Sequence, residues 1–202
     1  MPKNNMSLIE RGPVPAIILV LICAICVALL ALTADVTADA RAYQAQWLAD
    51  TNKRALFPLA DDFPEETLEQ AGEGIPGAKT VDLAQLHPEV YMVAAVHTGG
   101  EVTGLIIGVA SKGYGGKVPV MVGFDLSGTV VGIHVDASGE TPGLGQKTAD
   151  ASFTDQYLGR LSDDSLSDID AVTSATISSN AVTASVREAS FAYDALMRKG
   201  GK

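Results

Sequence analysis

Residues 91–109 read YMVAAVHTGGEVTGLIIGV, and this stretch decides the fold class that we expect for the chain. Two runs rich in valine and isoleucine, 91–96 and 102–109, have the composition and length of β-strands. Gly99 and Gly100 lie between them, and a glycine pair is one of the dipeptides that suit the tightest hairpin turns. The stretch therefore predicts two antiparallel strands joined by a short turn.

The same pattern occurs again farther along the chain. Residues 117–124 and 129–135 are also rich in valine, and residues 125–128 (DLSG) between them have the composition of a turn. We expect the four runs to form one twisted antiparallel sheet. The glycine-rich loop 111–116 joins the two hairpins, and it is either a plain connection or, through Tyr114, a surface that faces a ligand.

Two helices are predicted after the sheet. One covers about residues 149–158, and the other begins near Ser178 or Ser179, both favourable N-cap residues, and runs to residue 197. A hairpin sheet with helices packed on it is an α+β domain, which is the fold class we expect. The second helix has an apolar stripe at helical spacing, formed by Val182, Val186, Ala189, Tyr193 and Leu196.

The N-terminal part of the chain predicts a membrane anchor. Residues 12–34 carry no charged side chain, and as a helix they would extend about 34 Å, enough to cross a hydrocarbon core of about 30 Å. A signal peptide cleaved near residues 36–38 is the alternative. Lys3 and Arg11 precede the apolar run and Asp35 follows it, so the positive-inside rule places the N-terminus in the cytoplasm. The rest of the chain would then lie outside the cytoplasmic (inner) membrane, as a single-pass protein.

The chain divides accordingly into four parts. We expect a cytoplasmic tail at 1–11, a transmembrane helix at 12–34, a helical extension and linker at 35–88, and the α+β domain at 89–202. The linker assignment depends on the many prolines and glycines before residue 88, because these residues punctuate loops.

Composition narrows the classes of function. The 202 residues include 24 Asp or Glu against 14 Lys or Arg, a net charge of −10, and a chain this acidic repels nucleic acid. Cys23 and Cys26 lie in the apolar run, where such a pair either packs against another membrane helix or takes part in redox or iron–sulfur chemistry. The three histidines share no metal-ligand spacing, so no metal site is predicted.

Two polar segments carry the candidate chemistry. The first, residues 138–147 (SGETPGLGQK), follows the last strand, and its glycines let the backbone approach a flat ligand closely. The second, residues 170–180 (DAVTSATISSN), places several hydroxyl groups at the start of the last helix, where the N-terminus favours a phosphate. By composition alone, the first segment is also typical of a turn and the second of a helix cap.

Together, the two segments resemble the FMN-binding domain of membrane redox pumps. The chain has Glu-Thr-Pro-Gly-Leu-Gly at 140–145 after a strand, and Asp-x-x-Thr-Ser-Ala-Thr-x-Ser at 170–178 before the last helix. Their order and the anchor are similar to the G subunit of Rnf electron-transport complexes, and the C subunit of the sodium-pumping NADH:quinone reductase shares both segments. Ser174 and Ser178 stand where that family more often has glycine and threonine. The resemblance covers the anchor and about residues 91–202.

The resemblance implies a covalently bound cofactor. In that family the last threonine of the second segment, here Thr176, holds FMN through a phosphoester bond that a separate flavin transferase makes. Asp170 matches the leading acid of the attachment motif. Backbone groups near Ser174 and Ala175 would neutralise the phosphate, and Thr173 would hydrogen-bond the phosphate or the ring.

Further contacts to the flavin ring follow from the same resemblance. Glu140, Thr141 and Leu144 would border the ring and its polar edge. Tyr114 is an additional candidate, and Lys147 either stabilises negative charge on the flavin or is a solvated surface charge. No residue is expected to be catalytic, because the flavin supplies the redox chemistry.

The function implied is one step of an electron relay. The anchored FMN would pass electrons between other subunits of a membrane complex that links ferredoxin and NAD to the pumping of Na⁺ or H⁺. Three alternatives stay open: membership of the quinone-reductase pump, a stand-alone extracytoplasmic flavoprotein, and a non-redox module whose hydroxyl-rich segment binds another phosphate or a polyol.

Overall fold

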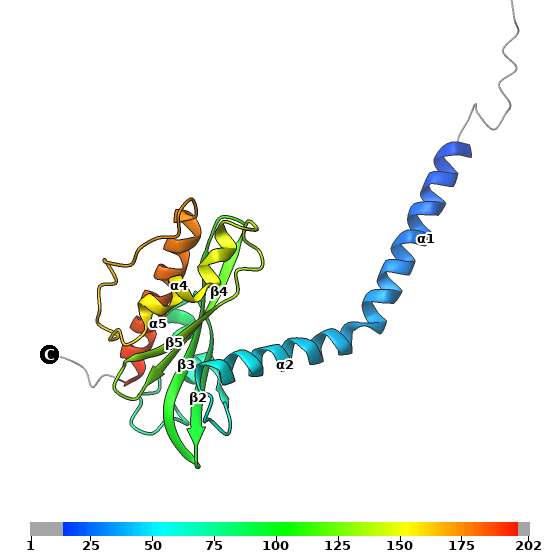
Figure 1. Cartoon of the computed structure of the whole chain (residues 1–202). Helices are drawn as coiled ribbons and strands as arrows, with labels where there is room; N and C mark the ends of the chain where they lie inside the picture. Colours follow the sequence, from blue (N-terminus) through cyan, green and yellow to red (C-terminus); the bar gives the residue numbers. More distant parts are fainter. Residues whose placement is uncertain (1–13, 198–202) are drawn as a thin grey trace, which may run out of the picture. The chain divides into compact units, whose positions relative to one another are not determined.

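A computed structural model describes residues 14–197 of the chain and divides it into two units, residues 1–49 and 50–202 (Figure 1). Lys3 and Arg11, on which the predicted orientation of the anchor rests, lie outside the described residues. Each unit is described below by itself.

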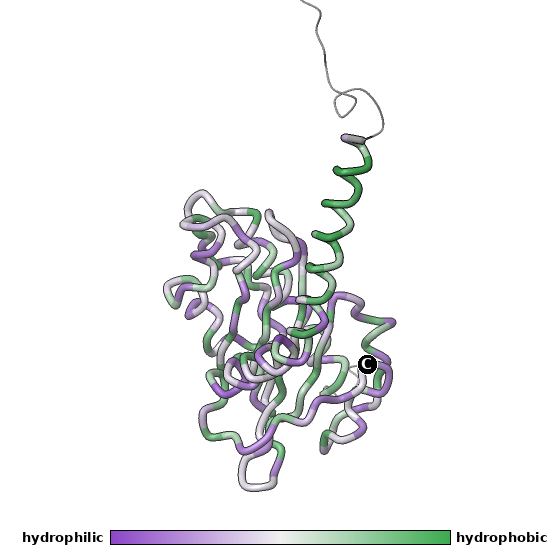
Figure 2. Tube along the Cα trace, turned by 90° about the vertical axis from the view of Figure 1, so that its right-hand side faces the viewer, coloured by the Kyte–Doolittle hydropathy of each residue, from purple (hydrophilic) through white to green (hydrophobic). Residues whose placement is uncertain are grey.

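The first unit is helical. Helix α1 (Val14–Val36) is mostly apolar and carries no charged side chain before Asp35, as the green stretch in Figure 2 shows, and Pro15–Val36 is long and apolar enough to cross a membrane. None of the side chains in that span is buried within the chain. Helix α2 (Ala38–Leu56) is more polar, begins after Thr37, and its last residues belong to the second unit.

The second unit is built on a five-stranded antiparallel sheet. Its strands β1 (Glu65–Glu66), β2 (Val90–Thr98), β3 (Glu101–Lys112), β4 (Lys117–Asp125) and β5 (Val130–Val135) are neighbours in chain order. The four longer strands and both predicted hairpins are confirmed. Gly99 and Gly100 have φ angles of 63° and 84°, the left-handed conformation that a two-residue turn between twisted strands requires.

Alternate residues of the strands face two separate apolar clusters, because side chains in a strand point to opposite faces. Leu105, Ile107 and Val109 of β3 pack in the larger cluster, together with the buried side of helix α5 (Thr176–Met197), which Figure 1 shows along the sheet. Ile106 packs on the other face with Phe63. Helix α5 therefore covers one face, as the α+β prediction requires, and the end of α2 with the segment after it covers part of the other.

Residues 57–88 form part of the packed domain rather than the predicted linker. They include β1, a 3₁₀ turn at Leu68–Gln70 and the short helix α3 (Leu83–Leu86). Ala71, Ile75 and Leu83 are buried in the larger cluster. The prolines and glycines of this segment do prevent long helices or strands, but they leave the apolar residues between them free to be buried.

The predicted helix at 149–158 is also different in the structure. A 3₁₀ helix, η2 (Gly145–Ala149), is followed by the short helix α4 (Ala151–Thr154) and a 3₁₀ turn, η3 (Asp155–Tyr157). Asp150 has an extended backbone, with φ −72° and ψ 145°, which separates η2 from α4. A polar residue that leaves the helical region interrupts a pattern whose apolar spacing alone looks helical.

Helix α5 begins at Thr176, earlier than the predicted N-caps at Ser178 and Ser179. Both serine side chains are buried in the first turn and have other partners. The Ser178 hydroxyl donates to Glu140, and the Ser179 hydroxyl accepts from the Val172 N–H. The hydroxyl groups that suggested a cap therefore link the helix to neighbouring segments.

Candidate functional site

A pocket of about 490 Å³ lies where three segments of the second unit meet. The segments are the loop between β3 and β4, the start of η2 with the loop before it, and the start of α5. The pocket is lined by Tyr114, Thr141, Leu144, Gly145, Ser174, Ala175, Thr176, Ile177 and Ser178. The two polar segments identified in the sequence are thus brought together, although residues 148–169 separate them.

Most of the sequence-predicted site residues line this pocket. They are Tyr114, Thr141, Leu144, Ser174, Ala175 and Thr176. Thr173, Lys147 and Asp170 are exposed and do not line it, while Glu140 is buried behind the lining residues. Three lining residues were not predicted: Gly145, Ile177 and Ser178. All three belong to the quoted segments, but the proximity of Gly145 to Ser178 is visible only in the folded chain.

The backbone before α5 turns sharply at Ser174, which has a φ of 64°. The Ala175 N–H donates to the Val172 carbonyl at 3.0 Å and closes this turn. The first turn of α5 contains no acidic side chain. Since the first N–H groups of an α-helix have no partner inside the helix, this end presents donors and a positive dipole to the pocket.

Thr176 is the first residue of α5, and its side chain is exposed at the pocket. The rest of the lining combines hydroxyl groups of Thr141 and Ser174 with the larger apolar side chains of Leu144 and Ile177. None of the nine lining residues is Asp, Glu, His, Lys or Arg. The pocket therefore suits a ligand with one anionic end, bound at the helix start, and one flat apolar part.

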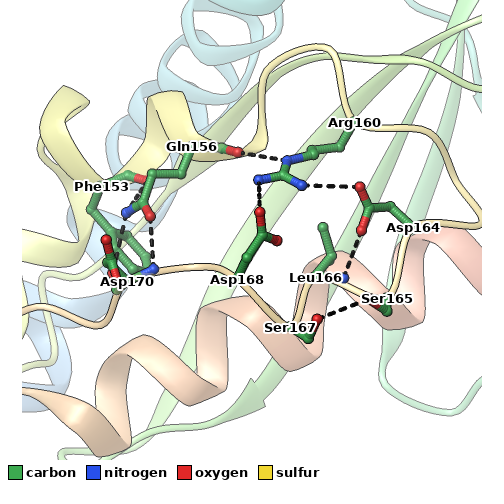
Figure 3. A network of polar contacts seen from close by, with 9 residues as sticks. All are labelled: Phe153, Gln156, Arg160, Asp164, Ser165, Leu166, Ser167, Asp168 and Asp170. Atoms are coloured by element: carbon green, nitrogen blue, oxygen red, sulfur yellow. Dashed lines mark hydrogen bonds and ion pairs between the residues drawn. The ribbon is translucent and has the colours of Figure 1, made fainter.

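The loop that leads to this helix is held by a polar network, drawn in Figure 3. The Gln156 side-chain amide bonds the backbone of Asp170 in both directions: its nitrogen donates to the carbonyl at 3.1 Å, and its oxygen accepts from the N–H at 2.7 Å. Arg160 bonds Asp164 at 3.1 Å and Asp168 at 2.7 Å. The hydrogen bond from Arg160 lowers the pKa of the Asp168 carboxyl.

Metal ligands are not clustered in the part of the chain that the structure describes. Among residues 14–197, no three His, Cys, Asp or Glu side chains lie together in a way that holds a metal ion. Cys23 and Cys26 are free thiols on the exposed surface of α1.

The second unit matches a known family of domains. Residues 113–190 match the FMN-binding domain family, a range that contains the three segments of the pocket. A solved structure of the C subunit of the Na⁺-translocating NADH-quinone reductase from Parabacteroides distasonis has the same fold, with a TM-score of 0.51 and 18% identity over 71% of this chain and 81% of that one.

Whole-length relatives are more similar in sequence. The G subunit of the Na⁺-translocating ferredoxin:NAD⁺ oxidoreductase complex of Acetobacterium woodii is 31% identical over 197 residues, 90% of this chain and 91% of the relative. The G subunit of the ion-translocating oxidoreductase complex of Methanosarcina acetivorans is 32% identical over 85% of this chain and 88% of the relative. These matches confirm the resemblance that the two polar segments predict. The chain belongs to the family of G subunits of ion-translocating (Rnf-type) oxidoreductase complexes.

Proposed function

We propose that this chain is the membrane-anchored electron-transfer subunit of an Rnf-type complex and that it carries FMN covalently on Thr176. The observation that carries this proposal is the exposed hydroxyl of Thr176 at the first residue of α5, inside the pocket of an FMN-binding domain. A phosphoester there would hold the phosphate beside the unpaired N–H groups of the helix start.

The pocket fits the two chemically different ends of FMN. Ser174 and the start of α5 offer donors to the phosphate, while Leu144, Ile177 and Tyr114 offer apolar contact to the flat ring. Thr141 also lines the pocket and can hydrogen-bond the polar edge of the ring. The flavin, when bound, supplies the electron-transfer chemistry, and the chain binds and orients it and shields part of it from water.

Three further residues have proposed roles outside the lining. Thr173 is one residue from the pocket and would contact the phosphate from the turn before α5. Lys147 is exposed on η2, and a flexible cation there would favour negative charge on a nearby flavin. Asp170 is exposed, and we assign it to the recognition of the chain by an attaching enzyme.

Attachment requires a separate flavin transferase. A threonine hydroxyl is a weak nucleophile unless a neighbouring base activates it. The lining of the pocket holds no carboxylate, imidazole or amine that would serve as this base. The chain therefore has the features of a substrate for attachment and lacks those of a self-modifying enzyme within the described pocket.

The anchor is proposed to be α1, retained in the mature protein as a single span of the cytoplasmic membrane. Its length and unburied apolar surface suit a helix in lipid. The positive charges at Lys3 and Arg11 favour a cytoplasmic N-terminus, which places the flavin domain outside the cytoplasm. The partners would be the other subunits of a complex that couples ferredoxin and NAD to ion transport, as the names of the relatives state for their own complexes.

One measurement tests attachment and anchor together. The intact mass of the denatured protein, purified from its own membranes, should exceed the chain mass by FMN less one water, with residues 1–38 still present. Thr176→Val should lack the adduct, while Thr103→Val, which removes an exposed hydroxyl on β3 outside the pocket, should keep it. An unmodified wild-type chain in cells with an active transferase would refute the covalent flavin and favour a non-redox phosphate-binding module. A mass that begins near residue 39 would instead identify a cleaved signal peptide.

A further inference from the structure

Glu140 is a buried carboxylate that two parts of the pocket share. Only 4% of the residue is exposed. Its Oε1 accepts a hydrogen bond from the Gly115 N–H at 3.0 Å, and its Oε2 accepts one from the Ser178 hydroxyl at 2.5 Å. No basic side chain forms an ion pair with it among residues 14–197. We call this arrangement, from the Gly115 N–H through Glu140 to the Ser178 hydroxyl, the Glu140 bridge.

Glycines leave the space that the bridge occupies. A Cβ on Gly113 would lie 2.5 Å from Oε1 of Glu140, and a Cβ on Gly145 would lie 2.8 Å from Oε2 and 2.7 Å from the Ser178 hydroxyl. Real Cβ atoms do not come so close to neighbouring atoms, so any larger residue at either position would displace the carboxylate. The surrounding chain is thus shaped around this one side chain.

The bridge joins all three segments that line the pocket. Gly115 follows Tyr114 in the loop after β3, Glu140 directly precedes Thr141, and Ser178 belongs to the first turn of α5. Glu140 does not line the pocket itself, which differs from its predicted place at the ring. It is buried beneath the lining residues, next to Gly145 and Ser178.

We propose that Glu140 is a positioning residue whose bridge fixes the Tyr114 loop against the first turn of α5, and whose negative charge lowers the reduction potential of the flavin. The effect on the reduction potential rests on the proposed function, whereas the role of the bridge in positioning the loop does not. Both carboxylate oxygens accept hydrogen bonds, one from a backbone N–H and one from a hydroxyl group. A buried negative charge with no paired cation opposes the addition of electrons to a nearby ring, because the low dielectric screens it poorly.

Amide hydrogen exchange at Gly115 tests the bridge without any flavin. The full chain in detergent micelles is used, in a Thr176→Val background so that every sample lacks the attachment hydroxyl. Glu140→Ala should speed exchange at Gly115 about tenfold, since a hydrogen bond to a buried acceptor is lost. Glu140→Gln should keep exchange within about twofold of the parent, because its carbonyl still accepts from Gly115 and its amide donates to Ser178. If Glu140→Ala misfolds, Ser178→Ala removes one end of the bridge and should loosen Gly115 to a smaller degree.

The midpoint potential of the flavin-loaded full chain tests the charge. Glu140→Gln keeps the shape and removes the charge, so the potential should become more positive than in the wild type. Asp150→Asn is the matched control: it also removes one carboxylate, but an exposed one outside the pocket lining, and solvent screens its effect. A merely structural role of Glu140 would leave the potential of Glu140→Gln unchanged.

The outcomes separate this inference from the proposed function. Unchanged Gly115 exchange in both Glu140→Ala and Ser178→Ala would overturn the bridge. A potential that moves no more in Glu140→Gln than in Asp150→Asn would overturn the electrostatic role. A wild-type chain without flavin would refute the proposed function and the electrostatic role with it, while the exchange comparison would still decide the bridge.

Discussion

Two neighbouring glycines after β3 have different surroundings. A Cβ on Gly115 would lie 2.1 Å from the carbonyl oxygen of Gly139, whereas a Cβ on Gly116 would have no atom within 4 Å. We expect Gly115→Ala to destabilise the fold by about 1–3 kcal/mol, because backbone must move against backbone. Gly116→Ala should be close to neutral, within about 1 kcal/mol. Thermal unfolding of the full chain in micelles measures both, and equal effects of the two variants would contradict the close packing of this loop on Gly139.

His134 in β5 makes stability depend on pH. Burial lowers the pKa of its imidazole below 6.5, and the nearby Asp136 opposes this shift only in part. The unfolded chain therefore takes up a proton near pH 6.5 that the folded chain takes up only at lower pH. Stability present above pH 6.5 should decline as the pH falls through 6.5 toward the folded pKa.

A single substitution isolates this contribution. His134→Gln should flatten the loss of unfolding temperature between about pH 7 and pH 5.5, since the other two histidines are present in both proteins. Carboxyls whose pKa values are lowered, such as Asp125, lose their contribution only near pH 4 and below. Parallel pH profiles for the wild type and His134→Gln would show that His134 is not the group responsible.

The pocket residues show what the sequence could and could not predict at this scale. Thr141, Leu144 and Thr176 belong to contiguous motifs, so their chemistry is visible in the printed order of residues. Glu140 belongs to the same motif, but the partners that bury it, Gly115 and Ser178, lie 25 and 38 residues away. Burial of a polar side chain depends on such tertiary partners, and a local pattern does not contain them.

The Gln156 side chain in η3 fixes one point, Asp170, of the segment between η3 and α5. Gln156 bonds the backbone of Asp170 in both directions, at 3.1 and 2.7 Å. We expect Gln156→Ala to slow covalent attachment of FMN several-fold, because the segment before Thr176 would have to be ordered each time the transferase binds it. Gln70→Ala, which removes an exposed amide in the 3₁₀ turn after β1, is the matched control.

The measurement is a time course of flavin attachment by intact mass, with purified transferase and its flavin substrate. Unfolding temperatures of Gln156→Ala and the wild type should stay close to each other, because the hydrogen bonds lost are at an exposed backbone. An attachment rate that is unchanged or higher in Gln156→Ala would show that the transferase prefers a loose segment, and it would contradict this role of Gln156.

Whole helices and strands were predicted correctly where the sequence contains a local signal for them, and incorrectly where they depend on distant parts of the chain. The two hairpins were predicted because glycine turns and β-branched runs are local signals, and both appear in the sheet. Strand β1 is only two residues long, Glu65 and Glu66, and its pairing with β2 has no local signature. The helix expected at 149–158 is interrupted by the extended backbone of Asp150 and then divided into α4 and η3, and the sequence has no local signal for either break.

The whole domain is stabilised from both faces of the sheet. The face opposite α5 is covered by Phe57 and Phe63. A Cβ placed on Gly104 or on Gly123 would lie 2.9 Å from the ring of Phe57. Because glycine has no side chain, these two strand positions leave room for the aromatic ring. The end of α2 and the segment after it therefore contribute apolar contacts that the boundary expected at residue 89 leaves out.

The boundary of the folding unit gives the last prediction. A fragment of residues 50–202 should be soluble and unfold cooperatively, because it retains Phe57, Phe63 and the buried part of the segment before β2. A fragment of residues 89–202 should aggregate or lack a cooperative transition, since it exposes Met92, Ile106 and other residues that are otherwise buried. Circular dichroism during heating distinguishes the two. Cooperative unfolding of both fragments at the same temperature would show that residues 50–88 are only a covering of the domain, and it would support the linker that the prolines and glycines predict.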